Sequence, residues 1–523
     1  MLIRIHGAKC VGIQAEKVTV EVSIDRGIGI HLVGLADVAV KESLLRTTTA
    51  LQALGFHIPG KRMVINLAPA DVHKNGSGYD LPIAIGIIAA SEQCSLPLIG
   101  EYMIMGELGL DGSVRGVPGG LPFSELARSE GFEGIILPMD SALEAAELDN
   151  MKVYGVRDLG EVVHLLSGGD SDGLLVRNSR EYARLLEQKG DPGRRDIPDF
   201  ADILGLEGAK RGLEIAAAGA HNICMIGPPG SGKSSLAKAL VGILPPMSME
   251  ESLMTSKIFS IAGKGKLRCG LMDTRPFRSP HYSASLAAII GGGAGDNIVP
   301  GEISLAHNGI LFLDEAAQMP RSVSEALRGP VEDRKVTISR LKAKVEYPAS
   351  FMLVMASNPC PCGYWGVGDR CTCTAMQRLN YISKLSGPMM DRIDIQLSVP
   401  SLSSPELARL KAEYVKAEPS SAVARRVAAA RERQRRRFSG EGIYSNAEMG
   451  NRQVERFCRL DGDCQELLVS LMDKLGLSMR AYFRIIKVAR TIADLEGNPD
   501  IRPAHISEAA CYRFLDRTPG VKF

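Results

Sequence analysis

Hydrophobic and polar positions along the chain form short apolar runs that alternate with longer stretches of helical spacing. Among the first 168 residues, the runs VTVEVSI (18–24) and RMVINLAP (62–69) predict strands, and the stretch between them at 38–55 predicts a helix. Strands and helices that alternate in this way are typical of a compact α/β or α+β domain. We therefore expect residues 1–168 to form one such domain.

Three later apolar runs lead into a glycine, a pair of carboxylates or an amide. They lie at 223–226, 309–315 and 350–359, and a helical pattern at 199–219 leads into the first of them. Uninterrupted apolar runs suit buried strands of a parallel sheet. The pattern predicts an α/β core over residues 199–400.

Composition shifts mark the borders of this core. Residues 169–198 are rich in Gly, Asp, Ser and Arg around one short helical pattern, which is typical of a linker. Beyond the core, LSMRAYFRIIKVARTIADLEG (477–497) is a strong helical pattern. We expect residues 401–523 to form a helical lid domain.

Length and composition bound the class of protein. A chain of 523 residues, 45% hydrophobic and 23% charged, has the profile of a globular protein with about three domains. Its formal net charge of +2 means that any nucleic-acid surface is local. No apolar run approaches the length of a membrane span and the N-terminus has no signal-peptide pattern, so we expect a cytoplasmic protein without a membrane partner. Eleven cysteines, an odd number, favour reduced thiols over a disulfide framework.

Residues 227–234 (GPPGSGKS) carry the phosphate-binding loop pattern G-x-x-x-x-G-K-[ST] between an apolar strand and a helix. Glycines let successive N–H groups turn toward one anion, and the helix N-terminus adds partial positive charge. Lys233 is expected to reach the β- and γ-phosphates of ATP, and Ser234 to ligate Mg²⁺. An ordinary Gly-rich turn is the alternative. The residues expected to bind the nucleotide are Gly227, Pro228, Pro229, Gly230, Ser231, Gly232, Lys233, Ser234 and the adjoining Ser235.

The next two apolar runs supply candidate hydrolytic groups. GILFLDE (309–315) ends in two carboxylates, and parallel strands place such residues beside the phosphate loop. Asp314 is expected to hold Mg²⁺ through water, and Glu315 to orient or deprotonate the attacking water. The alternative is a strand that happens to end in acidic residues. Asn358, at the end of the third run, carries an amide able to bond the γ-phosphate or the lytic water.

Four segments behind the loop carry a family resemblance. RPFRSPHYSAS (275–285), PGEISLAHNGILFLDE (300–315), LSGPMMDRID (385–394) and LSMRAYFRIIKVARTIADLEG (477–497) occur in this order. Together they resemble the YifB/ComM branch of the magnesium chelatase-like AAA+ family, over essentially the whole chain. The resemblance implies a P-loop AAA+ core and a hexameric ATPase, which in the competence-protein member drives DNA branch migration during natural transformation. A chelatase-type or chaperone-like motor is the alternative function.

The same resemblance implies roles for three polar residues. Asn358 falls at the sensor-1 position and Arg480 at the sensor-2 position. Arg392 falls where related rings place an arginine finger, which acts on the nucleotide of a neighbouring subunit and so implies an oligomer. The alternative for Arg392 is a salt bridge with Asp391 or Asp394.

The first domain has a resemblance of its own. Residues 106–138 resemble the proteolytic domain of Lon proteases and the tail domain of RadA-type proteins, which share the fold of ribosomal protein S5 domain 2. Lon-type peptidases use a Ser-Lys dyad, but Pro122 stands where the lysine is expected and Ser77 is one position out of register. A serine without its base is a weak nucleophile. We expect a non-proteolytic domain for assembly or DNA handling, with an active peptidase as the alternative.

Cationic residues give three candidate contacts with DNA. Residues 335–347 alternate as a hairpin does, with Arg340, Lys342 and Lys344 near its turn, where they are able to line a pore and grip phosphates or simply to aid solubility. A denser run reads equally as a nucleic-acid patch and as a lid helix with a solvated face. A third group, in 275–285, suits substrate contact or subunit coupling. The run comprises Arg425, Arg426, Arg431, Arg433, Arg435, Arg436 and Arg437, and the third group comprises Arg275, Arg278 and His281.

Four cysteines follow the third apolar run. Cys360, Cys362, Cys371 and Cys373 form C-x-C-x8-C-x-C, which is able to close a structural Zn²⁺ site, although these spacings are tighter than usual. Free or redox-active thiols are the alternative. Four thiolates leave no open coordination position, which argues against catalytic zinc. We expect His281 and His307 to form hydrogen bonds rather than to bind metal.

Overall fold

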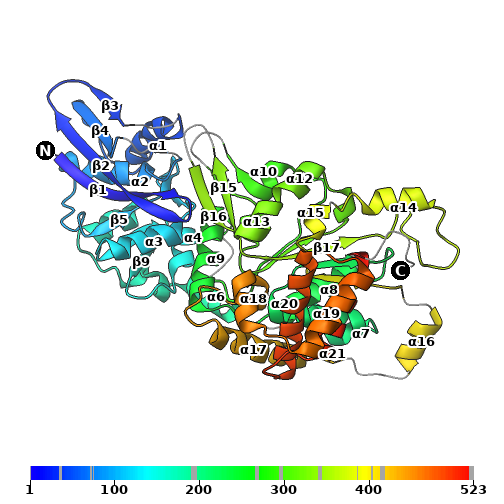
Figure 1. Cartoon of the computed structure of the whole chain (residues 1–523). Coiled ribbons are helices and arrows are strands. Elements are labelled where there is room, and N and C mark those ends of the chain that lie inside the picture. Colours follow the sequence, from blue (N-terminus) through cyan, green and yellow to red (C-terminus); the bar gives the residue numbers. More distant parts are fainter. Residues whose placement is uncertain are drawn as a thin grey trace.

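The computed structural model describes residues 2–34, 38–70, 73–74, 76–189, 197–264, 270–293, 298–339, 344–385, 387–401, 404–412 and 418–516. Two large sheets organise these residues. A seven-stranded sheet lies within residues 2–156, and a five-stranded sheet lies within residues 223–398. The first sheet forms one end of the molecule, and the C-terminal helices lie beside the second (Figure 1).

The first sheet is mixed, with the order β3-β4-β2-β1-β5-β8-β9. Antiparallel pairing joins β1 to β2 and β2 to β4, and parallel pairing joins the other neighbours. The strands expected at 18–24 and 62–69 are present as β2 and β4. The strand bounds are β1 (Leu2–Val11), β2 (Gln14–Asp25), β3 (Gly29–Val33), β4 (Arg62–Ala68), β5 (Tyr102–Ile104), β8 (Gly134–Pro138) and β9 (Lys152–Val156).

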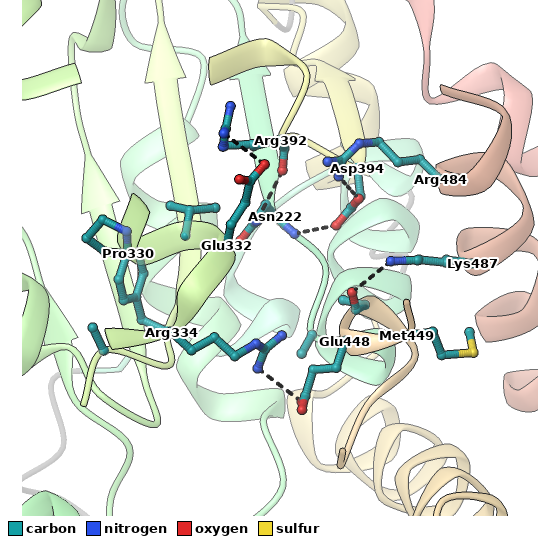
Figure 2. A pocket seen from close by; sticks show the side chains of 15 residues that line it. Asn222, Pro330, Glu332, Arg334, Arg392, Asp394, Glu448, Met449, Arg484 and Lys487 are labelled. Carbon is teal, nitrogen blue, oxygen red and sulfur yellow. Dashed lines mark hydrogen bonds and ion pairs between the residues drawn. The ribbon is translucent and has the colours of Figure 1, made fainter. Parts of the chain in front are cut away.

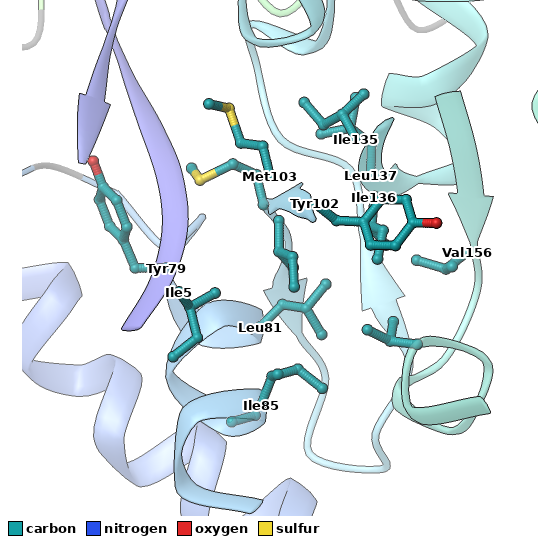
Figure 3. Close-up of a cluster of buried hydrophobic side chains, with 14 of the residues drawn as sticks. Ile5, Tyr79, Leu81, Ile85, Tyr102, Met103, Ile135, Ile136, Leu137 and Val156 are labelled. Carbon is teal, nitrogen blue, oxygen red and sulfur yellow. The ribbon is translucent and has the colours of Figure 1, made fainter. Parts of the chain in front are cut away.

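Helices close the core of this sheet. Helix α2 (Asp80–Ala90) is buried along its whole length, because its sequence DLPIAIGIIAA is almost entirely apolar. Its Leu81 and Ile85 pack near Ile5 of β1 and Met103 of β5 (Figure 3). The helix expected at 38–55 is α1 (Val38–Ala53), and α3 (Gly120–Ser129), α4 (Met139–Ala142) and α5 (Leu159–Leu166) also contribute side chains to this core.

Much of the stretch expected as a linker belongs with this first sheet. Two short 3-10 turns and helix α6 (Arg180–Lys189) follow β9, and Val176, Tyr182 and Leu185 pack on the core of the sheet. Arg157 and Glu181 form an ion pair of 2.8 Å. The Gly- and Asp-rich composition of 169–189 therefore conceals an apolar face, and residues 190–196 lie outside the described part of the chain.

The second sheet is parallel throughout, with the order β11-β14-β17-β10-β18. Strand β17, which leads to Asn358, lies between the strand before the phosphate loop and the strand that ends at Asp314–Glu315. The carboxyl ends of these three strands meet at one edge, where ligands of α/β sheets bind. The bounds are β10 (Ile223–Ile226), β11 (Phe277–Arg278), β14 (Ile310–Leu313), β17 (Met352–Ser357) and β18 (Ile395–Ser398).

Several helices surround this sheet, and a hairpin projects from it. The expected hairpin is β15 (Lys335–Ser339) paired with β16 (Lys344–Pro348), and it stands between the first sheet and the second (Figure 1). Lys344 begins β16, whereas Arg340 and Lys342 lie outside the described residues. The helices are α7 (Glu207–Gly219), α8 (Lys233–Ala239), α9 (Met249–Ile261), α10 (Leu286–Ile290), α11 (Glu302–Leu305), α12 (Arg321–Ala326), α13 (Arg328–Asp333), α14 (Ala375–Ile382) and α15 (Gly387–Met390).

The first domain packs against helix α9 of the core. The backbone N–H of Gly119 donates to the carbonyl of Ser260 at 3.2 Å, and the N–H of Leu271 donates to Glu147 at 2.9 Å. The β1–β2 turn also approaches the hairpin, since a Cβ built on Gly12 would lie 3.3 Å from Val345.

Two of the C-terminal helices, α17 and α20, pack on α7. In α17, Gln434 Nε2 donates to the carbonyl of Ala218 at 2.8 Å, and Arg431 Nε to that of Ala217 at 3.1 Å. No helix among the described residues is long and apolar enough to cross a membrane. The bounds are α16 (Ser404–Ala412), α17 (Ser420–Arg437), α18 (Asn451–Phe457), α19 (Gly462–Leu475), α20 (Met479–Glu496) and α21 (Pro503–Cys511).

Candidate active site

The phosphate loop links β10 to α8 in the order that its sequence predicts. Gly230 and Gly232 have φ values of 74° and 89°, a conformation that favours glycine. A Cβ built on Gly230 would meet nothing within 4 Å, so the loop is open at this position. Ser234 and Ser235 are exposed at the start of α8.

Lys233 is buried and folded back on the loop. Its Nζ donates to the carbonyls of Gly227 and Pro228 at 2.7 and 2.8 Å, and lies 3.4 Å from Asn358 Oδ1. Burial lowers the pKa of Lys233, while Asp314 and Glu315 act to raise it. A phosphate would offer this ammonium charged acceptors in place of carbonyl dipoles.

Ser234 and Asp314 form the candidate magnesium site. Ser234 Oγ donates to Asp314 Oδ2 at 2.9 Å, so the hydroxyl and the carboxylate already face one another. Oxygen ligands of this type suit Mg²⁺. Ser231 Oγ is buried and has no hydrogen-bond partner within the described structure, so this hydroxyl is able to donate to a phosphate oxygen. The residues present therefore fit both ATP and Mg²⁺.

Glu315 and Asn358 complete this edge of the sheet. Glu315 has the left-handed φ of 50°, and its N–H donates to Asp314 Oδ1 at 2.9 Å. This left-handed backbone is uncommon for a residue other than glycine, and such strain often lies at functional sites. The N–H of Gly227 donates to the carbonyl of Ser357 at 3.2 Å, which ties the phosphate loop to the strand of Asn358.

Two apolar or aromatic neighbours of the site were not predicted from the sequence. Leu206 Cδ1 would lie 3.6 Å from a Cβ built on Gly232, so the segment before α7 borders the phosphate loop. Burial and Glu315 raise the pKa of Tyr381 in α14, while Ser357 acts to lower it, so this ring lies near the end of β17. No sequence motif marks either residue.

The four cysteines converge directly behind Asn358. Cys360 Sγ lies 3.3 Å from Cys362 Sγ and 3.8 Å from Cys371 Sγ, and all four sulfur atoms lie within 4.8 Å of one another. These separations exceed a disulfide bond of about 2.05 Å. They match the roughly 3.8 Å between thiolates that each lie about 2.3 Å from one tetrahedral Zn²⁺. The Tyr364 backbone N–H lowers the pKa of Cys362 to about 6, whereas burial raises the pKa of Cys360 to about 12.

The opposite edge of the second sheet carries a cationic cavity of about 230 Å³ (Figure 2). Arg392 pairs with Glu332 at 2.8 Å, Arg334 with Glu448 at 3.1 Å, and Arg484 with Asp394. Burial acts to raise the pKa of Asp394, but Arg484 and His221 hold it well below its usual range. Lys487 also faces the cavity and donates to the Ala447 carbonyl at 3.2 Å.

Arg480 lies at this same edge. Its Nη1 is 2.9 Å from Asp391 Oδ2, one residue from Arg392, and its side chain is 67% exposed. Strand β18 separates these arginines from the phosphate loop. Asp391–Asp394 precede the strand, and Val399, which lies beside Gly227, follows it. Asp391 and Asp394, the expected alternative partners of Arg392, pair with Arg480 and Arg484, and Arg392 pairs with Glu332. Neither Arg392 nor Arg480 is beside its own phosphate loop.

Most of the dense arginine run holds α17 in place. Arg426 bonds Glu214 at 2.6 Å, Arg433 bonds the Asp494 carbonyl at 2.7 Å, and Arg437 forms an ion pair with buried Asp494. Only part of the run faces solvent, where Arg435 and Arg436 share Glu432. The helical interpretation of the run is confirmed.

The other cationic group is also engaged in internal contacts. Arg275 bonds Glu251 at 2.8 Å and the Asn308 carbonyl at 2.8 Å, and Arg278 bonds Glu302 at 2.5 and 2.7 Å. His281 is exposed and lies 2.7 Å from Ser283 Oγ. His307 is buried, accepts from the Ser350 N–H at 3.0 Å, and thus forms hydrogen bonds as expected.

The described residues of the first domain do not assemble the alternative, a peptidase dyad at Ser77. Ser77 Oγ donates to the Glu107 carboxylate, and Pro122 lies in buried helix α3. Buried Lys74 donates to the Pro69 carbonyl instead. The arrangement offers Ser77 a carboxylate partner in place of a lysine base.

Comparisons with known proteins agree with this geometry. Three family models match: "Magnesium chelatase, subunit ChlI" at residues 199–407, "Subunit ChlI of Mg-chelatase" at 20–141, and "Magnesium chelatase, subunit ChlI C-terminal" at 417–513. The chain is 42% identical to YifB of Salmonella typhimurium and 40% identical to competence protein ComM of Haemophilus influenzae. Each alignment covers 98% of this chain and 97% of the relative.

A more distant relative is the DNA replication licensing factor mcm6 of Dictyostelium discoideum. It is 24% identical over 60% of this chain and 34% of its own length. The nearly full-length matches decide the assignment: the chain belongs to the YifB/ComM branch of the magnesium chelatase-like AAA+ ATPases.

Proposed function

We propose that this protein is a ring-shaped ATPase that remodels DNA in the cytoplasm. The observation that carries the proposal is the division of polar groups between two edges of one sheet. Lys233, Ser234, Asp314 and Asn358 gather at the carboxyl edge, while Arg392 and Arg480 lie at the amino edge. Each edge holds half of a site for phosphoryl transfer.

At the carboxyl edge, the phosphate loop and Lys233 hold the β- and γ-phosphates of ATP. Ser234 and Asp314 are the residues that would hold Mg²⁺, and a bound ion would neutralise charge on the phosphate oxygens. Glu315 orients the attacking water or takes its proton. The Asn358 amide, close to Lys233, positions the γ-phosphate or the water.

Completion of this site requires a second subunit. Strand β18 separates Arg392 and Arg480 from their own phosphate loop, so a neighbour's nucleotide is the one that they are able to reach. A contact between unlike edges is heterologous, and such a contact forms a ring when the rotation between subunits closes. We propose a hexamer in which Arg392 and Arg480 stabilise charge on the transferred phosphoryl group in trans.

The proposed load is branched DNA. One relative is named a competence protein and another a DNA replication licensing factor. Both names support DNA as the substrate. The β15–β16 hairpin, with exposed Lys344, projects from the core, and six copies of Arg340, Lys342 and Lys344 would line a pore and contact phosphates without base readout. We infer branch migration or helicase activity in recombination during natural transformation.

The domain assignments are part of this proposal. We propose that residues 1–168 form a non-proteolytic Lon-like, S5-like domain and that 401–523 act as a lid on the AAA+ core at 199–400. The Ser77–Glu107 contact favours this domain over a Lon-like protease. A chelatase-type or chaperone-like motor is the second candidate, because three chelatase-subunit models match the chain.

One experiment separates these candidates. ATP hydrolysis and strand exchange are measured on labelled three- and four-way DNA junctions, with Lys233→Ala and Glu315→Gln as controls. We expect the junctions to stimulate ATP hydrolysis by the wild type. We expect strand exchange with the wild type and not with either variant. A wild type that ignores DNA but is stimulated by a protein or a porphyrin would overturn the DNA proposal.

We also propose that Cys360, Cys362, Cys371 and Cys373 bind a structural Zn²⁺. Zinc would cross-link a loop that has few apolar side chains of its own. Metal analysis of the wild type should give about one zinc per chain, and a Cys371→Ser/Cys373→Ser variant should give almost none. Equal, near-zero contents would remove the site.

A further inference from the structure

The loop that carries the four cysteines, Cys360–Cys373, rests on the phosphate loop. Gly363 has a φ of 86°, and a Cβ built on it would lie 2.8 Å from Pro229 Cδ, 2.9 Å from Pro229 Cγ and 3.9 Å from Asn358 Cγ. Only a glycine allows this approach without displacing the proline ring. The cysteine loop therefore lies in contact with the wall of the nucleotide site.

Both ends of the cysteine loop are attached to groups of that site. Its first cysteine follows Asn358–Pro359 at the end of β17. Its last cysteine precedes α14, and Arg378 Nη1 of α14 donates to the Cys373 carbonyl at 3.2 Å. Tyr381 of the same helix lies near Ser357, Glu315 and Cys360, each of which affects its pKa. The path from β17 through the cysteines to α14 thus closes around the Asn358 side of the phosphate loop.

Few buried side chains stabilise this loop. Among its described residues, only Cys360 and Gly363 are buried, and most of residues 364–370 are exposed. Such a loop has few apolar contacts to offset its conformational entropy. An ion that joins four sulfur atoms would supply the missing constraint, and Gly363, next to Cys362, would be held against Pro229.

We propose that zinc in the cysteine loop and nucleotide in the phosphate loop are thermodynamically coupled through the Gly363–Pro229 contact. The inference rests on the proposed zinc site and gives the metal a role, which is to hold the wall formed by Pro229 and Asn358 in the shape that binds phosphate. Coupling is reciprocal, so zinc tightens nucleotide binding and nucleotide tightens zinc binding by the same factor.

The chain offers a built-in reporter and a matched pair of variants. Trp365, the single tryptophan of the sequence, lies within the cysteine loop, 5.0 Å from the Arg378 guanidinium. Gly366 has a φ of 88°, almost the value at Gly363, but a Cβ built there meets nothing within 4 Å. Gly363→Ala and Gly366→Ala therefore impose similar backbone strain, and only the first perturbs Pro229.

The test measures the affinity of full-length protein for fluorescent mant-ADP in excess Mg²⁺, with and without a chelator that prefers zinc to magnesium. Zinc content and Trp365 fluorescence are recorded for each sample. We expect chelation to weaken mant-ADP binding roughly fivefold or more, a factor typical of coupled sites. Gly363→Ala should keep its zinc and the unfolding transition of the wild type, yet it should bind mant-ADP as weakly as the chelated wild type. Gly366→Ala should bind mant-ADP like the untreated wild type.

The reciprocal measurement uses the same samples. Saturating ADP–Mg²⁺ should raise the chelator concentration that removes half of the zinc, by the same factor, in the wild type and not in Gly363→Ala. One zinc per chain with equal affinities before and after chelation, or with Gly363→Ala equal to Gly366→Ala, would overturn the coupling alone. A wild type without zinc would overturn the metal site and the coupling together.

Discussion

Arg480 and Asp391 form an ion pair of 2.9 Å at the amino edge of the second sheet, one residue from Arg392. The pair places Arg480 and Arg392 at the amino edge of the second sheet, whereas their own phosphate loop lies at the carboxyl edge. If this amino edge meets the loop of a neighbour, both arginines act only after the nucleotide has bound there. Binding and hydrolysis should then respond differently to their removal.

Arg392→Ala should lower kcat for ATP roughly a thousandfold or more, the effect of an arginine finger. Its affinity for mant-ADP should change little, because the residue lies away from its own nucleotide. Steady-state hydrolysis and direct titration of the nucleotide check both parts. A kcat within about threefold of the wild type would contradict the role.

Glu315→Gln should retain nucleotide binding and lose hydrolysis. The amide keeps the shape of the carboxylate, whose backbone has a φ of 50°, but accepts no proton from water. General-base removal typically costs a factor of about 10² to 10⁴. Single-turnover ATP hydrolysis measures the loss, and a parallel loss of mant-ADP binding would show that Glu315 serves the fold instead.

The hairpin cations should govern the salt dependence of DNA binding. An Arg340→Ala/Lys342→Ala/Lys344→Ala variant should bind junctions more weakly, and its log–log salt slope should be shallower by roughly 0.7 to 0.9 for each phosphate that the variant no longer neutralises. Arg435→Ala/Arg436→Ala is the control, because these exposed arginines share Glu432 on α17. If the control variant loses more DNA affinity than the hairpin variant, α17 and not the hairpin carries the DNA-binding surface.

Arg437→Ala should destabilise the protein by about 3 kcal/mol, because it leaves buried Asp494 without one of its two arginine partners. Arg436→Ala, with an exposed ion pair, should change the free energy of unfolding by less than about 1 kcal/mol. Urea unfolding of the two variants compares these values. Equal effects would mean that the run does not fix α17.

Buried His307 should make stability fall in mild acid. Burial lowers its pKa from 6.5 to about 4, so between these values the unfolded chain binds a proton that the folded chain excludes. Stability from this group is complete above pH 6.5 and declines toward pH 4, by roughly 3 kcal/mol at most. His307→Asn preserves an acceptor for the Ser350 N–H and should flatten this part of the unfolding profile; an unchanged profile would assign it to other groups.

The sequence predicts strands, helices and local motifs better than it predicts partners. The phosphate loop, Asp314–Glu315, the hairpin and α17 follow from spacing and alternation, since each is encoded within about 20 residues. The pairing of Arg392 with Glu332, or of Arg437 with Asp494, depends on which helices meet, and charge counting does not show this. Composition also gave no sign that Val176, Tyr182 and Leu185 pack on the core of the first sheet, because polar residues outnumber these few apolar ones.

The shared active site is tested most directly by mixing two inactive variants. Lys233→Ala lacks a working phosphate loop but keeps Arg392, and Arg392→Ala has the opposite defect. In randomly mixed rings of equal parts, about a quarter of the interfaces join an intact loop to an intact arginine, since every interface takes one edge from each subunit. We predict that the mixture hydrolyses ATP well above either variant alone, toward this fraction of the wild-type rate. A mixture no more active than the sum of its parts would contradict a site built by two subunits.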